Sequence, residues 1–108
     1  MAGKEILDRE HLARYTLGDV ELEQEVLGLF IGQVPETVTM LRDSLDARAW
    51  TLAAHTIKGS ARAVGAWRLA DVAEQAESQS EYKDQWQQLA DDVEAAVAEV
   101  HARIAASD

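Results

Sequence analysis

The sequence predicts an all-α protein, an antiparallel four-helix bundle with a short additional helix at its N-terminus. The chain has 108 residues with one proline and six glycines, and these two residue types are the ones that helices tolerate least. Apolar residues recur at spacings of three and four along four long segments, as amphipathic helices require. Because the length suits one hydrophobic core, we expect a single domain over residues 1–108 whose helices pack as a bundle.

The first two helices are expected to begin at aspartates, whose side chains accept hydrogen bonds from the first helical turn. A short helix would begin at Asp8, end at Gly18 and direct Leu12 and Tyr15 inward. Asp19 would begin a longer second helix. The apolar residues that define the inward face of this second helix are Leu22, Val26, Leu29, Phe30, Val34, Val38, Leu41 and Leu45.

Pro35 lies within the second helix, and because proline lacks a backbone N–H we expect a kink there. A third helix is predicted over about residues 48–64 and ends near Gly65, since glycine readily adopts the conformation that terminates helices. A fourth helix is predicted over about residues 67–79. The last helix carries an apolar stripe that would close the bundle, formed by Tyr82, Trp86, Leu89, Val93, Val97, Val100 and Ile104.

The net charge and the cysteine count exclude several classes of partner and site. The chain has 20 Asp and Glu against 10 Lys and Arg, a formal charge of −10, whereas nucleic acids and anionic membranes attract basic surfaces. The absence of cysteine excludes disulfides and thiolate metal sites. No apolar run approaches the roughly 18 residues of a membrane span, and no signal-like leader precedes Lys4. We therefore expect a cytoplasmic monomer that binds neither nucleic acid nor membranes.

One stretch of the chain opposes this acidic character. Residues 47–70 contain no Asp or Glu, although the rest of the chain has 20 acids to 6 Lys and Arg. Buried helices are often poor in charge, but burial does not explain why cations remain while every anion is missing. The basic and titratable side chains of this stretch are Arg48, His55, Lys58, Arg62 and Arg68.

Helical geometry, at about 100° per residue, divides the third helix into two faces. The predicted core face comprises Trp50, Ala53, Ile57, Ser60, Ala61 and Val64. The predicted exposed face comprises Thr51, His55, Lys58, Gly59 and Arg62. A glycine within a helix costs about 1 kcal/mol relative to alanine, so we expect Gly59 to be there because another molecule approaches His55 closely.

Three kinds of chemistry are open to an exposed histidine in this setting. Metal binding needs further ligands one turn away, and hydrolysis needs a nucleophile oriented in a pocket. We expect neither, because Ser60 is predicted to face inward and a convex helix surface offers no cleft. Neutral imidazole is a good nucleophile near pH 7, and Lys58 and Arg62 could neutralise a phosphoryl group carried on it. The residues one turn from His55, none of them a suitable metal ligand, are Thr51, Leu52, Lys58 and Gly59.

The run Ala54-His55-Thr56-Ile57-Lys58-Gly59-Ser60-Ala61, followed by Gly65, Leu69-Ala70 and Ala76-Glu77, resembles the histidine phosphotransfer (HPt) domain. Its family pattern is Ala-His-x-Leu-Lys-Gly-Ser/Gly, from which Ile57 is a small departure. The resemblance implies that His55 accepts a phosphoryl group through Nε2 and that Lys58 is the electrostatic partner of that group. It implies that Gly59 leaves room for the partner protein. It also implies that Glu77 occupies the place of a carboxylate that contacts the histidine ring in relatives related to chemotaxis kinases.

The resemblance further implies a function. The protein would accept a phosphoryl group from a receiver-domain aspartate or a histidine kinase and pass it to the receiver domain of a response regulator, as a carrier and not an enzyme. It would need no cofactor of its own, because the divalent cation is expected on the receiver. Two alternatives stay open: a phosphoacceptor fragment of a chemotaxis-type or hybrid kinase, and a helical adaptor that is not phosphorylated.

The roles of several further residues follow from position alone. Arg62, Thr51 and Arg48 are candidates for binding the phosphate or the partner, because they lie near His55 in the predicted helix. Leu22 and Val26, near the start of the second helix, could form part of a docking surface. The other two histidines, His11 and His101, match no motif and are expected to be surface or packing residues.

Overall fold

The computed structural model describes residues 5–106, so Lys4 and the two ends of the predicted domain lie outside the described residues. Within this range the chain forms five α-helices and one short 3₁₀ helix and has no strand, which confirms the all-α prediction. None of these helices is long and apolar enough to cross a membrane. The elements are α1 (Arg9–Tyr15), α2 (Val20–Arg42), α3 (Ala47–Val64), α4 (Trp67–Ser78), η2 (Lys83–Gln85) and α5 (Trp86–Ala106).

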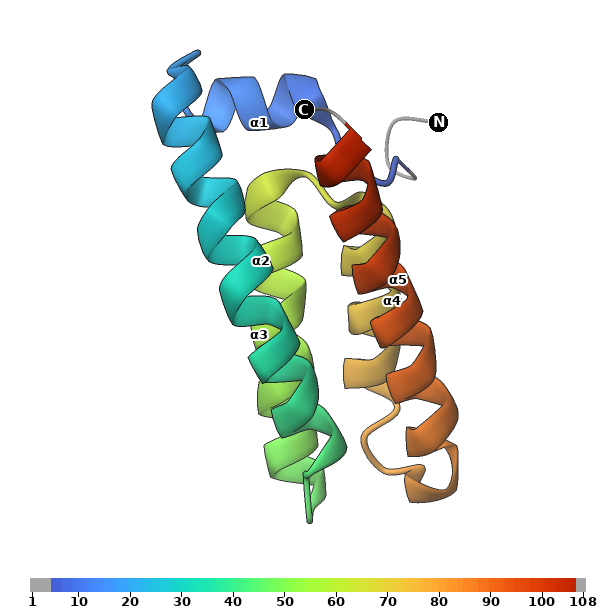
Figure 1. The fold of residues 1–108 in the computed structure, drawn as a ribbon. Coiled ribbons are helices and arrows are strands. Elements are labelled where there is room, and N and C mark those ends of the chain that lie inside the picture. Colours follow the sequence, from blue (N-terminus) through green and yellow to red (C-terminus); the bar gives the residue numbers. More distant parts are fainter. Residues whose placement is uncertain (1–4, 107–108) are drawn as a thin grey trace.

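The four long helices form a bundle in which α2 packs on α3, α3 on α4, α4 on α5 and α5 on α2 (Figure 1). Successive helices run in opposite directions because the connections between them are short. The short helix α1 lies across one end of the bundle and contacts α3. This arrangement leaves one long side of α3 free of any neighbouring helix.

Three helices begin at aspartates, as the sequence predicted for two of them. The side chains of Asp8, Asp19 and Asp46 each accept a hydrogen bond from the backbone N–H three residues later, at 2.8–3.1 Å. The end of α1 comes earlier than expected, at Tyr15 and not at Gly18. The chain turns over the intervening residues, where the N–H of Gly18 donates to the carbonyl of Ala13 at 2.8 Å.

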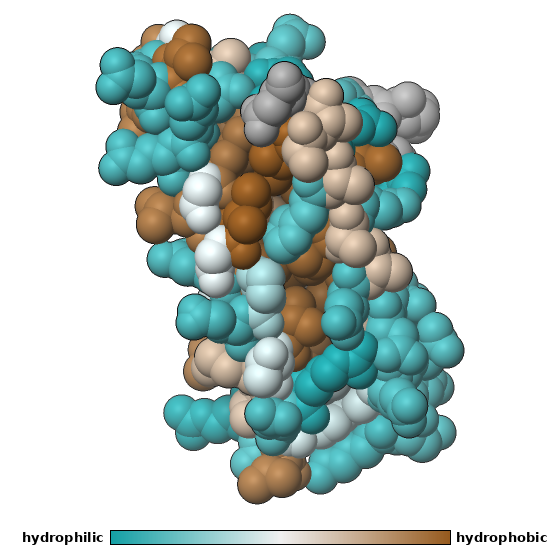
Figure 2. Space-filling view, in the orientation of Figure 1, coloured by the Kyte–Doolittle hydropathy of each residue, from teal (hydrophilic) through white to brown (hydrophobic). Residues whose placement is uncertain are grey.

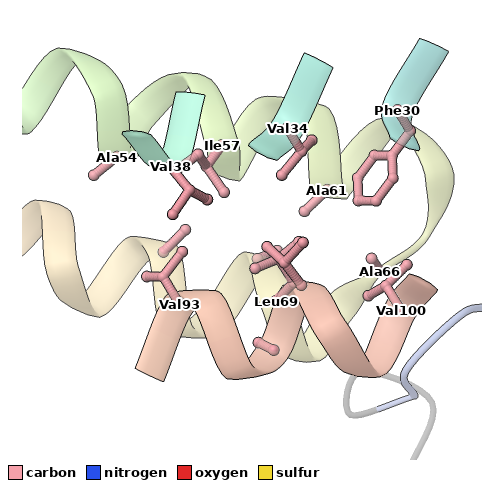
Figure 3. Packing of buried hydrophobic residues seen from close by; sticks show 14 of the residues in the cluster. Phe30, Val34, Val38, Ala54, Ile57, Ala61, Ala66, Leu69, Val93 and Val100 are labelled. Atoms are coloured by element: carbon pink, nitrogen blue, oxygen red, sulfur yellow. The ribbon is translucent and has the colours of Figure 1, made fainter. Parts of the chain in front are cut away.

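In the core, Phe30 and aliphatic side chains from α2 and α5 meet a surface rich in alanine on α3 and α4 (Figure 3). Small side chains allow two helices to approach closely, and this brings the side chains at the edge of α4 within reach of α3. Residues of the core labelled in Figure 3 include Phe30, Val34, Val38, Ala54, Ile57, Ala61, Leu69, Val93 and Val100.

Several apolar side chains predicted to face inward are exposed. The buried stripe of α2 passes through Leu27, which was not among the residues predicted to face inward. Leu22 and Leu29 therefore lie outside the buried stripe. Leu45 lies beyond the end of α2, in the connection to α3. The exposed side chains in question are Tyr15, Leu22, Leu29, Leu45 and Tyr82.

The helix α2 continues through Pro35 without ending, so the proline does not divide the helix into two. Pro35 faces the seam between α2 and α5, where a groove of about 360 Å³ is also lined by Val38, Val97 and His101. Figure 2 shows apolar surface along this seam. The expected kink at Pro35 stays a prediction.

Candidate functional site

The helix α3 presents His55 on its solvent side. Ala54 and Ile57, which flank His55 on the core face, are fully buried, whereas the His55 side chain is 63% exposed. The packed face of α3 fixes the helix, and the histidine therefore projects from a rigid element. This agrees with the face assignment made from helical geometry.

Gly65 ends α3 and ties it to the start of α1. Its φ of +81° is left-handed, and a Cβ at this position would lie 2.9 Å from the carbonyl oxygen of Asp8. The N–H of Asp8 also donates to the carbonyl of Gly65 at 2.9 Å. Only glycine combines this conformation with so close an approach, and the C-terminal end of α3 is thereby held in place.

One carboxylate of α4 binds two side chains of α3. Oε2 of Glu77 lies 2.9 Å from Nδ1 of His55, and Oε1 of Glu77 lies 2.6 Å from Nζ of Lys58. The Glu77 side chain is 21% exposed, and it reaches α3 from the edge of the α4 core face. The structure thus brings together three of the residues that the sequence singled out.

The charge of Glu77 sets the roles of the two ring nitrogens of His55. The hydrogen bond from Lys58 lowers the pKa of Glu77, and the contact with His55 adds to this, against the opposing effect of burial. An ionised carboxylate only accepts hydrogen bonds, so Nδ1 must carry the proton that it shares with Glu77. When the ring is neutral, Nε2 then has the lone pair on an exposed ring, and such a nitrogen is a nucleophile.

The basic patch predicted from residues 47–70 is partly neutralised in three dimensions. Lys58 was expected to be exposed, but its side chain is only 13% exposed because it packs against Glu77. Arg62 lies 3.8 Å from Glu74, and Arg68 lies 2.9 Å from Glu99. The stretch has no acid of its own, but α4 and α5 supply acids beside it.

An open groove of about 510 Å³ lies beside His55, which corrects the expectation that the surface of α3 offers no cleft. The Glu77 side chain of α4 lines the groove opposite the first turns of α3. Arg48 and Thr51 line it, whereas Arg62 does not. The groove is also lined by Ala47, which no sequence pattern connected with the site, and by Leu52, which was placed one helical turn before His55 but considered only as a metal ligand.

Ser60 lies on a different surface from the His55 groove. It was predicted to face the core, but it is half-buried and lines a smaller groove of about 150 Å³ between α2 and α3, with Val26 and Leu29. No hydrogen bond joins Ser60 to His55 among the described residues. The arrangement therefore offers no serine nucleophile to an imidazole base.

Gly59 is exposed, and no atom outside its own helix lies within 4 Å of the place where a Cβ would be. Among the described residues, no intramolecular contact therefore requires a glycine at this position. The interpretation that it leaves room for a partner stays a prediction.

Residues 5–106 hold no group of three or more His, Cys, Asp or Glu side chains that could bind a metal ion.

The fold and the site define a helical-bundle protein with an exposed surface histidine whose Nδ1 contacts a carboxylate. A model of the Hpt domain family matches residues 25–103, about three quarters of the chain, and this segment includes the whole cluster described above. The chain belongs to the Hpt domain family. Hpt domains are phosphocarriers that exchange phosphoryl groups with receiver domains and kinases in two-component signalling. No curated protein and no solved structure matches the chain.

Proposed function

We propose that this protein carries a phosphoryl group on Nε2 of His55, which it takes from a receiver aspartate or a kinase and passes to a receiver domain in a phosphorelay. The observation that carries the proposal is the pairing of Nδ1 with Glu77 at 2.9 Å on a ring that is 63% exposed. In the neutral ring this pairing puts the proton on Nδ1 and leaves the lone pair on Nε2, open to a partner. We place the carrier in the cytoplasm, as a monomer, as the sequence analysis expected.

In the transfer step, the lone pair of Nε2 attacks the phosphorus of the partner's acyl phosphate in line with the bond that breaks. The N–P bond forms, the P–O bond to the aspartate breaks, and the aspartate leaves as a carboxylate. The imidazole ring then carries a positive charge with its proton still on Nδ1. The ionised Glu77 at 2.9 Å offsets that charge. The divalent cation is proposed to belong to the receiver, where it would stabilise the charge on the transferring phosphoryl group.

The cations around His55 have different positions and therefore different proposed roles. Lys58, which lies one turn after His55 and is held by Glu77 at 2.6 Å, is placed to interact with the phosphoryl group. Arg48 and Thr51, which line the groove beside His55, are proposed to contact the partner. Arg62 lies 3.8 Å from Glu74, which precedes Glu77 in α4, and its proposed role is to attract the partner's acidic metal site from a distance.

The groove of about 150 Å³ between α2 and α3 supports a docking surface on a face of α3 beside the one that carries His55. Val26 and Leu29 line it, and Leu22 nearby is 39% exposed. Exposed apolar side chains of this kind commonly mark protein interfaces. We propose that the receiver covers this surface while its phosphoaspartate reaches His55 past Gly59.

Incubation with a phosphorylated receiver tests the proposed function. The wild-type chain should take up phosphate in an acid-labile, alkali-stable form, and His55→Gln should take up none. His11→Gln and His101→Gln are matched controls that should retain the phosphate. Phosphate on His55→Gln, or no uptake from any of a panel of receivers and kinases, would contradict the proposal and favour a helical adaptor.

A further inference from the structure

Trp50 forms a contact between α3 and α4 that involves a buried side-chain N–H. Trp50 is 1% exposed, and its Nε1–H donates to the main-chain carbonyl of Ala76 at 2.7 Å. Main-chain carbonyls within a helix are normally engaged, but those of the last turn are not. Ala76 lies in the last turn of α4, which ends at Ser78. The tryptophan thus supplies a hydrogen bond at the point where this helix would otherwise fray.

The carbonyl of Ala76 belongs to the same planar peptide unit as the nitrogen of Glu77. A hydrogen bond to this carbonyl therefore fixes the plane from which the Glu77 side chain departs. The remaining cap contact is longer, since the N–H of Gln79 lies 3.3 Å from the same carbonyl. Trp50 is consequently the better-placed group to hold this last turn against α3.

The indole of Trp50 is itself fixed from a third helix. It stacks on Trp86 of α5, with 4.4 Å between ring centroids and 7° between ring planes. The Nε1 atom of Trp86 is buried and has no hydrogen-bond partner among the described residues. The two indole rings therefore stack on each other, but of the two only Trp50 donates a hydrogen bond to α4.

We propose that Trp50 is a positioning residue for the phosphoacceptor histidine and acts through Glu77. Trp50 holds the Ala76–Glu77 peptide unit, Glu77 holds the proton on Nδ1, and Nε2 of His55 stays free to react. Without the indole N–H, the Glu77 carboxylate spends less time on Nδ1, and the tautomer with the proton on Nε2 gains population. This inference rests on the proposed function for its consequence in phosphotransfer, but the tautomer of His55 can be measured without it.

Three matched variants of the full chain separate the hydrogen bond from packing. Trp50→Phe removes the N–H to Ala76. Trp86→Phe removes the stacked indole but no hydrogen bond between described residues. Trp67→Phe removes an indole hydrogen bond of 2.9 Å to Asp8 at the opposite end of α4. For each variant, nitrogen-15 NMR gives the tautomer of His55, and a phosphorylated receiver gives the transfer rate.

We expect Trp50→Phe alone to raise the population of the Nε2–H tautomer and to slow transfer by about three- to tenfold, the effect of losing one hydrogen bond. Trp86→Phe and Trp67→Phe should change the rate by less than about twofold. A second substitution distinguishes positioning from general loosening. In a Glu77→Ala background, Trp50→Phe should slow transfer no further, because the two residues act in series.

Equal effects of Trp50→Phe and Trp86→Phe on the tautomer, or a further rate loss in the Glu77→Ala background, would overturn the inference. Should Trp50→Phe fail to fold, the wild type still tests it, because a scalar coupling must cross the hydrogen bond from Trp50 Nε1 to the Ala76 carbonyl carbon. Absence of that coupling overturns the inference too. A wild type that accepts no phosphoryl group contradicts the proposed function instead, and leaves the tautomer result standing.

Discussion

At both ends of α4 a carboxylate and a histidine lie close together, and only one of these two places combines the carboxylate with an exposed imidazole ring. At the start of α4, Asp8 accepts hydrogen bonds from the Trp67 indole at 2.9 Å and from the backbone N–H of His11 at 3.1 Å. At the end of α4, Glu77 accepts from Lys58 and contacts His55. In both places the hydrogen bonds lower the pKa of the carboxyl group, chiefly through Trp67 for Asp8 and through Lys58 for Glu77.

The two histidines differ in which ring nitrogen is available. The ring of His11 packs edge-on against Trp67, 4.8 Å between centroids, and its Nε2 is buried without a partner among the described residues. The ring of His55 is exposed, and its Nδ1 is held by Glu77. A nearby carboxylate therefore does not make a histidine reactive by itself. The reactive arrangement needs the carboxylate on one nitrogen and open solvent at the other.

The largest expected effect comes from Gly65→Ala, which disrupts the contacts around Asp8 at the start of α4. The new methyl group would meet the carbonyl of Asp8 at 2.9 Å in a left-handed conformation, and the two penalties together amount to about 3 kcal/mol. We expect the Tm to fall by at least about 10 °C. Thermal unfolding followed by circular dichroism measures this, and a shift of less than about 3 °C would show that the chain relaxes around the methyl group.

The second largest effect is expected from Lys58→Ala, which removes one of the two side chains that Glu77 binds at the end of α4. Loss of a charge-assisted hydrogen bond near the phosphoryl group should slow transfer by about ten- to a hundredfold. The helical circular dichroism signal should not change, because Lys58 packs against Glu77 at the edge of the bundle and is not part of the hydrophobic core. Rate measurements with a phosphorylated receiver test this, with Lys58→Arg as the charge-conserving control. An unchanged rate would remove Lys58 from the mechanism.

The fold could be predicted because its information is local. The spacing of apolar residues predicted where the helices lie. The aspartates Asp8 and Asp19 predicted where two helices begin, and Gly65 predicted where α3 ends. The errors have a physical cause. In α2, spacings of three and four describe two stripes, one through Leu22 and Leu29 and another through Leu27, and only contact with the other helices decides which stripe is buried.

The site could be predicted only in part for the same reason. His55 was found because helical geometry within α3 places it outward, and its contact with Glu77 was expected from the family resemblance. The pairing of Lys58, and the groove beside His55, depend on how α4 lies against α3. Counting charges along residues 47–70 could not reveal them, because the neutralising acids are distant in sequence.

A smaller effect, of opposite sign to that of Gly65→Ala, is expected from Gly59→Ala. Open space surrounds this position, so the substitution should raise the free energy of unfolding by up to about 1 kcal/mol. It should nevertheless slow phosphotransfer, since the methyl group would stand where the receiver approaches. Urea unfolding and the transfer rate together test this. Stabilisation with an unchanged rate would show that the partner does not come close at Gly59.

The smallest expected effect is on the stability of the fold at low pH, and it distinguishes the carboxylate of Asp8 from that of Glu77. Both have a pKa in the folded chain below their ordinary values of 3.8 for Asp8 and 4.5 for Glu77, so the unfolded chain takes up protons first as the pH falls. Their contributions are complete above these ordinary values and are lost on acidification through the lower folded values. In urea unfolding between pH 6 and about pH 2.5, Glu77→Gln should reduce the slope of stability against pH from about pH 4.5 downward, whereas Asp8→Asn should do so only below about pH 3.8. Identical slopes for Glu77→Gln and the wild type would mean that the Lys58 and His55 contacts of Glu77 are not maintained in solution, and the orientation of His55 would lose its physical basis.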